Sequence, residues 1–416
     1  MRASTTVGRA KSKLFEGPLG PNGIKILTES MTQRAYFDWN ATAPLRPEAR
    51  EAMVAALALP GNASSGHSEG RVARQAIEKA RAQVADLVGA EVKNVTFTSG
   101  ATEANMLALT PALETVGGKA PRDRLFVSGV EHPSVRSGGR FLADKVETLA
   151  VDKDGVVDLV ALKAALAKAQ RPLVSVMLAN NETGVIQPIA AIAEIVHAAN
   201  GILHVDAVQG AGRIDCDLAA LGADLLSLSS HKLGGPQGAG ALARRDGIHI
   251  AEPLIRGGGQ ERNLRAGTEN VAAIAGFGAA AEAAQSARQA DALRMAALRD
   301  RFEAALLAQT PAAVIFGANA ARLPNTSLFA VPGLKAETAI ISFDLNGIAV
   351  SSGAACSSGK VQISSVLTAM GVDADLARGA VRVSLGWTTT EADIDLLLNA
   401  WMRVASTLLK SHANAA

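Results

Sequence analysis

The sequence predicts an α/β protein with a mainly parallel sheet, followed by a smaller α+β unit. From about residue 50 onward, apolar runs of strand length alternate with amphipathic runs of helix length, a pattern typical of a parallel sheet with helices on both faces. After one long helical segment this alternation stops, and strand and helix patterns are mixed. The 416 residues are sufficient for two domains, each with its own core.

The first part of the alternation is a helix followed by a short strand. Residues 73–89 carry apolar positions at helical spacing and end at Gly89, a residue that commonly terminates helices. Val95-Thr96-Phe97 then has the apolar character of a buried strand. Further strands are predicted at residues 125–127, 173–178, 202–205 and 225–228.

Helices are expected between these strands. One covers residues 158–170 and begins with Asp158 as a capping residue. Another covers residues 188–199 and has Pro188 in its first turn. A long helix, predicted at 272–307, leads out of the first unit.

The chain is expected to divide into three segments. Residues 1–30 are basic and contain a Gly/Pro-rich stretch without the apolar region of a secretory signal, which indicates a disordered tail or a mis-assigned start. Residues 31–290 form the predicted large domain. Residues 291–416, with strand patterns at 325–329 and 381–385, form the predicted small α+β domain.

Composition excludes several classes of function. The chain has 41 basic and 39 acidic residues, a net charge of +2 that provides no field for nucleic acid or an anionic membrane. No apolar run is long enough to span a bilayer. The two cysteines lie in unlike contexts and form neither a disulfide framework nor a CxxC metal site, which favours a reducing compartment such as the cytoplasm. Small-molecule chemistry is the better expectation.

Cys356 lies in a segment of small residues, from Val350 to Gly359. Nothing there is large enough to bury the thiol, so the segment is predicted to be a solvent-reachable loop that presents a nucleophile. The alternative is that a free cysteine serves as a small core residue. That alternative is expected to hold for Cys216.

Polar residues follow several predicted strands, at the edge where α/β sheets bind ligands. Residues 98–103 place hydroxyl groups and a glycine at the start of a helix, which suits a phosphate group but also an ordinary helix cap. Asp206 ends a buried strand and needs a partner or caps a loop. A metal site formed by His204 and Asp206 lacks a third ligand at suitable spacing.

Lys232 lies between a buried strand and a Gly-Gly-Pro turn. Desolvation there would lower the pKa of the amine and suit it to Schiff-base chemistry, whereas the alternative is a surface lysine in a loop.

Seven motifs together resemble one family, the pyridoxal-phosphate-dependent cysteine desulfurases. In chain order they are Ser99-Gly-Ala-Thr-Glu, Glu131-His-Pro, Asn180-Asn-Glu-Thr-Gly, Val205-Asp-Ala-Val-Gln, Ser229-Ser-His-Lys, Arg262-Asn-Leu-Arg-Ala-Gly-Thr and Ser351-Ser-Gly-Ala-Ala-Cys. The resemblance runs from about Tyr36 to about Glu391. It implies a fold-type I pyridoxal-phosphate enzyme, with a seven-stranded, mainly parallel sheet in the large domain, which acts as a homodimer.

The resemblance also implies roles for single residues. Lys232 would bind pyridoxal 5'-phosphate covalently and transfer the α-proton, Asp206 would pair with the pyridine nitrogen, and His132 would stack on the ring. The remaining cofactor contacts would come from Asn181, Gln209, Ala101, Thr102, Ser229 and His231, with Thr268 contributed by the second subunit. No metal is implied.

The implied reaction converts L-cysteine to L-alanine. Arg382, with Asn181 nearby, would bind the substrate carboxylate through its bidentate guanidinium fork. Cys356 would take the sulfur as a persulfide and pass it to a protein acceptor, such as an iron–sulfur scaffold. The alternatives are a selenocysteine lyase of the same fold, an aminotransferase, for which Cys356 would have no use, and an inactive paralogue that acts as a binding partner in sulfur trafficking.

Overall fold

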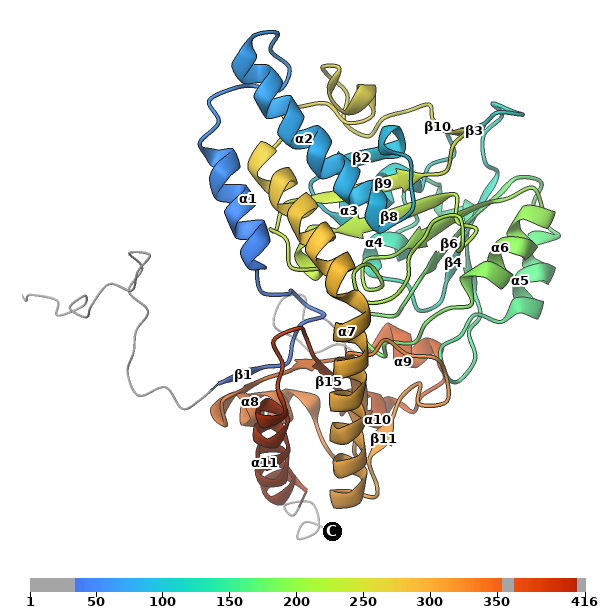
Figure 1. The fold of residues 1–416 in the computed structure, drawn as a ribbon. Coiled ribbons are helices and arrows are strands. Elements are labelled where there is room, and N and C mark those ends of the chain that lie inside the picture. Colours follow the sequence, from blue (N-terminus) through green and yellow to red (C-terminus); the bar gives the residue numbers. More distant parts are fainter. Residues whose placement is uncertain (1–33, 354–362, 410–416) are drawn as a thin grey trace, which may run out of the picture. The chain divides into compact units, whose positions relative to one another are not determined.

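The computed structural model describes residues 34–353 and 363–409 (Figure 1). The predicted tail of residues 1–30 and the predicted nucleophile Cys356 lie outside the described residues.

A seven-stranded sheet forms the centre of the first unit, in the order β2-β9-β8-β7-β6-β4-β5. Its strands are β2 (Val95–Thr98), β4 (Arg124–Ser128), β5 (Val146–Leu149), β6 (Pro172–Met177), β7 (Ile202–Asp206), β8 (Leu225–Ser229) and β9 (Gly240–Arg244). The pairs among β5, β4, β6, β7 and β8 are parallel, whereas β9 is antiparallel to both neighbours. The predicted seven-stranded, mainly parallel sheet is confirmed.

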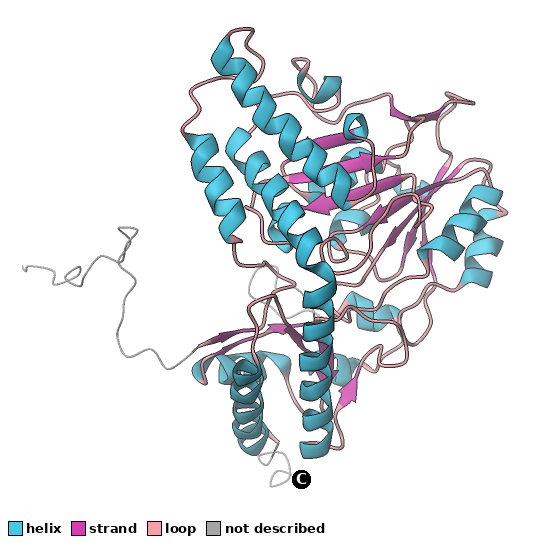
Figure 2. Ribbon diagram, in the orientation of Figure 1, coloured by secondary structure: helices cyan, strands magenta, loops and turns pink. Residues whose placement is uncertain are grey.

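Helices cover both faces of this sheet (Figure 2). They are α1 (Pro47–Leu57), α2 (Ser68–Leu87), α3 (Ala101–Ala108), α4 (Pro133–Arg136), α5 (Leu159–Leu166), α6 (Ile189–Ala198) and α7 (Val271–Gln309). One core cluster joins α2, α5, α6 and α7 to one face, and another joins α3 to the opposite face. All residues of β6, β7 and β8 are buried, as expected for strands covered on both sides.

The predicted helix boundaries differ slightly from those observed. Asp158 caps α5 as expected, because its carboxylate accepts hydrogen bonds from the amides of Val160 and Ala161. The helix ends four residues earlier than predicted, at Leu166. Pro188 is the residue before α6 rather than part of its first turn.

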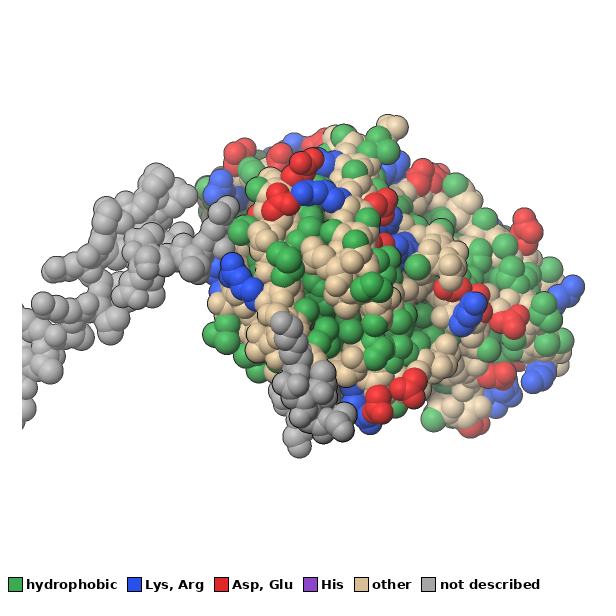
Figure 3. All heavy atoms as spheres, turned by 90° about the horizontal axis from the view of Figure 1, so that it is seen from below, with side chains coloured by type: hydrophobic (Ala, Val, Ile, Leu, Met, Phe, Trp, Pro, Cys, Tyr) green, Lys and Arg blue, Asp and Glu red, His purple; other side chains and the backbone are tan. Residues whose placement is uncertain are grey.

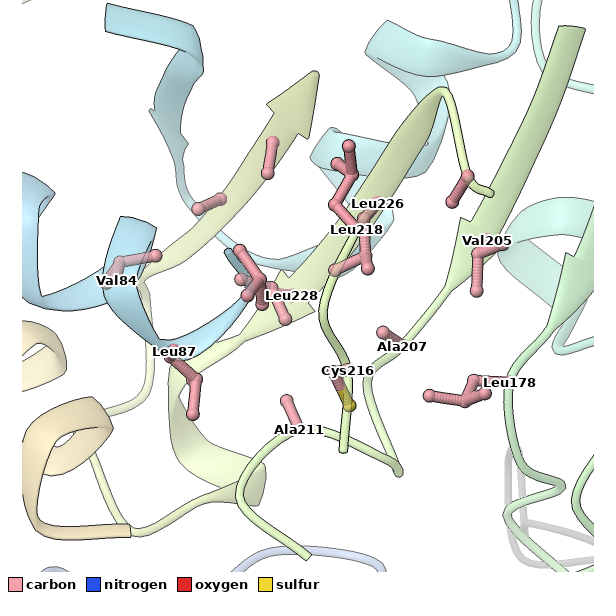
Figure 4. Packing of buried hydrophobic residues seen from close by; sticks show 14 of the residues in the cluster. Val84, Leu87, Leu178, Val205, Ala207, Ala211, Cys216, Leu218, Leu226 and Leu228 are labelled. Atoms are coloured by element: carbon pink, nitrogen blue, oxygen red, sulfur yellow. The ribbon is translucent and has the colours of Figure 1, made fainter. Parts of the chain in front are cut away.

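The core between α2 and the sheet includes the first of the two cysteines (Figure 4). Val84 and Leu87 of α2 belong to the same cluster as Leu226 and Leu228 of β8. Cys216 lies among them and is 1% exposed. The prediction that Cys216 is a packing residue is confirmed.

The second unit is built on a four-stranded sheet of order β11-β12-β15-β14. Its elements are β11 (Val314–Ile315), β12 (Thr326–Ala330), α8 (Ala336–Leu345), β13 (Ile348–Ala349), β14 (Ser351–Ser352), α9 (Ser365–Ala369), α10 (Ala374–Arg378), β15 (Val381–Ser384) and α11 (Glu391–Leu408). The short strand β1 (Ala35–Tyr36) pairs with β13, and β3 (Leu113–Thr115) pairs with β10 (Ile248–Ile250).

The core of this second unit surrounds the indole of Trp401. Phe329 contacts it edge-on with ring centroids 5.3 Å apart, and Phe343 stacks on it at 6.3 Å. The expected domain boundary at residues 290/291 falls inside α7. The apolar residues of α7 belong partly to the cluster that α2, α5 and α6 form on the large sheet and partly to the cluster around Trp401. The division into two domains stays a prediction.

The second unit also carries exposed apolar side chains on its helices. Ile341 and Leu345 of α8 are 62% and 82% exposed, and Met402 of α11 is 48% exposed. Figure 3, which looks at the end of the molecule where these helices lie, shows apolar side chains in the middle of the face and many of the charged ones toward its rim. None of the described helices combines the length and apolar character needed to cross a membrane.

Candidate active site

A cavity of about 680 Å³ lies where β6, β7 and β8 end. Ten of the predicted site residues line it, namely Ala101, Thr102, His132, Asn181, Asp206, Gln209, Ser229, His231, Lys232 and Arg382. Thr268 lines a different cavity, which shares Ser99 and Gly238 with the first. The role expected for Thr268 in a second subunit stays a prediction.

Lys232 reaches into the cavity from a short 3₁₀ helix, Ser230–Lys232, that follows β8 directly. Its Nζ donates hydrogen bonds to the carbonyl oxygens of Asn40 at 2.6 Å and Ala41 at 2.7 Å. Burial lowers the pKa of the amine to about 7, and the positive charges of Arg382 and Arg213 add to the effect. A substantial fraction of the amine is therefore neutral, and so nucleophilic, near neutral pH.

Asp206 is the last residue of β7, and its carboxylate is held on both sides. Oδ2 accepts a hydrogen bond from Nδ2 of Asn105 over 2.9 Å, and Oδ1 accepts one from the amide of Val208 over 3.1 Å. The residue is 5% exposed and lines the cavity. A fixed carboxylate in this position suits a protonated ring nitrogen or another buried cation.

His132 precedes α4 and caps it, since Nδ1 accepts a hydrogen bond from the amide of Ser134 over 3.2 Å. Burial lowers the pKa of the imidazole; the charge of Asp206 opposes this shift and that of Lys232 adds to it. A neutral imidazole in the wall of the cavity offers a flat face for stacking.

The amino end of α3 lines the cavity and is suited to an anion. Ala101 and Thr102 begin the helix, and the preceding Gly100 provides no side-chain cap, so amides of the first turn remain for a ligand. The backbone at Gly100 packs against β9, where a Cβ on Gly240 would lie 2.5 Å from the carbonyl carbon of Gly100. Only glycine allows this close approach.

Ser229 and His231 line the same cavity from the end of β8. Nδ1 of His231 lies 3.2 Å from Oγ1 of Thr42. Burial lowers the pKa of His231 to about 4, with the charge of Lys232 adding to the shift. The imidazole is therefore neutral and can donate one hydrogen bond to an anion.

Arg382 enters the cavity from β15 of the second unit. It donates hydrogen bonds to the carbonyl of Asn181 at 2.9 Å and to Oδ1 of Asp38 at 2.8 Å. Its buried Nε has no partner among the described residues. An unsatisfied donor on a buried guanidinium is costly, and a carboxylate in the cavity would satisfy it.

Two residues important to this geometry were not identified from the sequence. Asn40, which is 1% exposed, accepts hydrogen bonds at its carbonyl from Lys232 and from Nε2 of Gln209. Asn105 holds Asp206. Helical spacing could have indicated Asn105, because it lies one turn after Ala101, on the same face of α3.

The residues that flank the undescribed segment 354–362 are anchored near the cavity. Ser351 lines it, and the amide of Gly353 donates to the carbonyl of Ala380 over 3.1 Å. Oγ of Ser364 donates to Oε2 of the buried Glu182 over 2.5 Å.

The contacts of His204 do not support the alternative that it forms a metal site with Asp206. Nδ1 lies 2.8 Å from Oγ of Ser175, and Nε2 lies 2.9 Å from Oγ of Ser227. Both ring nitrogens are therefore engaged. Across residues 34–353 and 363–409 there is no cluster of three or more potential metal ligands.

The chain resembles known proteins over most of its length. Residues 35–397 match the family described as Aminotransferase class-V. A protein named "Cysteine desulfurase" from Cereibacter sphaeroides is 44% identical, with 88% of this chain and 94% of that protein covered. "Cysteine desulfurase IscS" from Dictyoglomus turgidum is 41% identical, with 91% and 96% covered. The solved structure of a NifS-like protein from Rickettsia africae is 37% identical, with a TM-score of 0.82 over 90% of this chain and 100% of that chain.

Proposed function

We propose that this chain converts L-cysteine to L-alanine and transfers the sulfur to an acceptor. The chain belongs to the class-V aminotransferase family and resembles cysteine desulfurases over most of its length. The observation that carries the proposal is the convergence of Lys232, Asp206, His132 and Arg382 on one cavity, although they come from four different elements.

The cavity fits pyridoxal 5'-phosphate. Lys232 offers the amine that attaches to the aldehyde, Asp206 a carboxylate for the ring nitrogen, and His132 a ring face. The phosphate group would be held by Ala101, Thr102, Ser229 and His231, and the ring oxygen by Asn181 and Gln209. When bound, this cofactor supplies an electron sink for the charge that develops at the α-carbon of the substrate.

Lys232 and Arg382 then perform complementary tasks on the substrate. Arg382 binds the α-carboxylate through the donor that is unsatisfied in this structure. Lys232, with a pKa of about 7, removes the α-proton and returns it, since a group with this pKa both accepts and releases protons at neutral pH.

Cys356 takes the sulfur. Its thiolate forms a bond to the substrate sulfur while the bond from that sulfur to Cβ breaks, and protonation of the remaining carbon framework gives alanine. The resulting persulfide passes to a protein acceptor, such as an iron–sulfur scaffold. Thr268 completes the phosphate site from the second subunit of a homodimer.

The assembled cavity supports an active enzyme over an inactive paralogue, and the relatives' names favour desulfuration over the lyase alternative. The test is to load the purified protein with pyridoxal 5'-phosphate, add cysteine and a thiol reductant, and measure alanine and sulfide together. Equal amounts are expected, with none from Lys232→Ala. Cysteine consumption without alanine, or unchanged turnover by the variant, contradicts the proposal.

A further inference from the structure

A second cavity, of about 480 Å³, lies at the opposite edge of the large sheet. Ile202, the first residue of β7, lines it, as does Arg171, which directly precedes β6. Arg122 precedes β4 by two residues, and Arg245 follows the antiparallel strand β9. All four residues therefore meet at the amino ends of the parallel strands, whereas the candidate active site lies at their carboxyl ends.

Each charged or titratable side chain that lines this second cavity is basic: Arg122, Arg171, His197 and Arg245. Two of them share the fully buried Asp224, which does not line the cavity. A guanidinium nitrogen of Arg245 lies 2.6 Å from its Oδ1, and Nε2 of His197 lies 3.0 Å from its Oδ2. The protein itself thus compensates the charge of Arg245.

Arg122 and Arg171 have no ion-pair partner among the described residues. Arg122 is 6% exposed, and its guanidinium donates only to the carbonyl oxygens of Leu113 and Asn200, each over 3.4 Å. The guanidinium of Arg171 makes no hydrogen bond or ion pair within the described part of the chain. The adjacent Asp123 carboxylate accepts hydrogen bonds from two backbone amides instead.

The two guanidiniums also repel each other. Burial lowers the pKa of Arg122 and the positive charge of Arg171 lowers it further, whereas the charges of Asp224 and Asp123 oppose the shift without reversing it. A buried guanidinium that forms no ion pair is unfavourable, so an anion that entered between these side chains would stabilise the protein. The cavity thus has both the charge and the open space that an anionic ligand requires.

We propose that this second cavity binds a phosphate dianion, either free or as the monoester of a small molecule, between Arg122 and Arg171. A phosphate monoester carries about 1.5 to 2 negative charges at neutral pH, which matches two guanidiniums that form no ion pair. The planar guanidinium fork also matches the geometry of phosphate oxygens. The cavity volume lies within the range of small-molecule sites, so there is room for an organic group beyond the phosphate.

The test is a calorimetric titration of the cofactor-loaded enzyme at constant ionic strength. The cofactor occupies the phosphate site of the first cavity, so added phosphate reports on the second. Inorganic phosphate and ribose 5-phosphate are titrated separately into the parent, Arg171→Gln, Arg122→Gln and the control Arg50→Gln. Arg50 is an exposed residue of α1, and its substitution makes the same change in charge.

We expect at least one probe to bind at one site per chain, with about tenfold or greater weakening by Arg171→Gln, the loss typical of a charge-assisted hydrogen bond. Arg50→Gln should leave the affinity unchanged, and Arg171→Gln should keep its desulfurase activity, which shows that it is folded. Binding of inorganic phosphate alone identifies a free ion as ligand, and binding of ribose 5-phosphate alone identifies a monoester. The proposal is overturned when neither probe binds at millimolar concentration, or when Arg171→Gln and Arg50→Gln weaken binding equally.

Discussion

Asn105 donates a hydrogen bond from Nδ2 to Oδ2 of Asp206 over 2.9 Å. This contact joins two parts of the proposed cofactor site, because Asn105 belongs to the helix whose first turn carries the amides of Ala101 and Thr102. The helix α3 therefore positions both the proposed phosphate site and the carboxylate proposed to pair with the ring nitrogen.

We predict that Asn105→Leu weakens the binding of pyridoxal 5'-phosphate by about tenfold, because one hydrogen bond to a buried charged group is lost. Titration of the apo protein, followed by cofactor absorbance, measures this affinity. The exposed Asn319→Leu serves as control and should bind like the parent. Unchanged affinity in Asn105→Leu would show that Val208 alone is enough to hold Asp206.

The lowered pKa of Lys232 predicts how covalent attachment of the cofactor depends on pH. The neutral amine is the reactive form, so the rate of attachment should rise with pH and level off above about 7. Arg382→Gln removes a nearby cation and should move the midpoint to higher pH. A rate in the parent that still rises near pH 10.5, the ordinary pKa of lysine, would contradict the assignment.

Arg382→Ala should raise the apparent KM for cysteine on the order of tenfold to a hundredfold, since a bidentate, charge-assisted pair is lost. Arg382→Lys should restore only part of the affinity, because a point charge cannot reproduce the fork. Steady-state kinetics with alanine as the readout measure both. Arg378→Ala, an exposed arginine of α10, is the control. An unchanged KM in Arg382→Ala would assign the arginine a structural role.

The raised pKa of Glu131 predicts that the stability of the protein depends on pH. Burial and the charge of Asp206 raise the pKa of Glu131 to about 8, whereas in the unfolded chain it ionises near 4.5. Between these values the unfolded state releases a proton that the folded state keeps, so the contribution of Glu131 to stability falls as the pH rises.

Glu131→Gln cannot ionise, and its side-chain oxygen can still accept the hydrogen bond from the Met177 amide, which spans 2.6 Å in the parent. The melting temperature of the variant minus that of the parent, both measured in the apo form, should therefore be larger at pH 8 than at pH 4.5. An equal difference between variant and parent at both pH values would show that Glu131 is ionised in the fold.

The strands that could be predicted are those with continuous apolar sequence. The predicted strand at 202–205 agrees with β7 (Ile202–Asp206), since burial on both faces leaves a plain signal. The strand β9 (Gly240–Arg244) was missed because Gly-Ala-Leu-Ala-Arg has little strand propensity. Its conformation depends on pairing with β2 and β8 instead.

In the candidate site, too, local sequence patterns indicate some residues and not others. Lys232 and Asp206 follow buried strands directly, so sequence position alone indicated where they meet. Asn40 contacts Lys232 across 192 residues of sequence, and no local pattern reports such a contact. Apart from Arg382, the described site residues found from the sequence lie in the seven motifs, whereas the supporting asparagines required the fold.

Alanine release from cysteine by Cys356→Ala measures most directly whether Cys356 accepts the sulfur. The variant should keep its bound cofactor and its absorbance change on adding cysteine, yet form almost no alanine and no persulfide. Cys216→Ala is the matched control and should behave like the parent, since burial raises the pKa of that thiol to about 12 and leaves it unreactive. Selenocysteine is assayed in parallel: activity of Cys356→Ala that is lost with cysteine but kept with selenocysteine leaves both activities possible and identifies Cys356 as the sulfur-specific nucleophile. Full alanine release from cysteine by Cys356→Ala would show that Cys356 is not the sulfur acceptor.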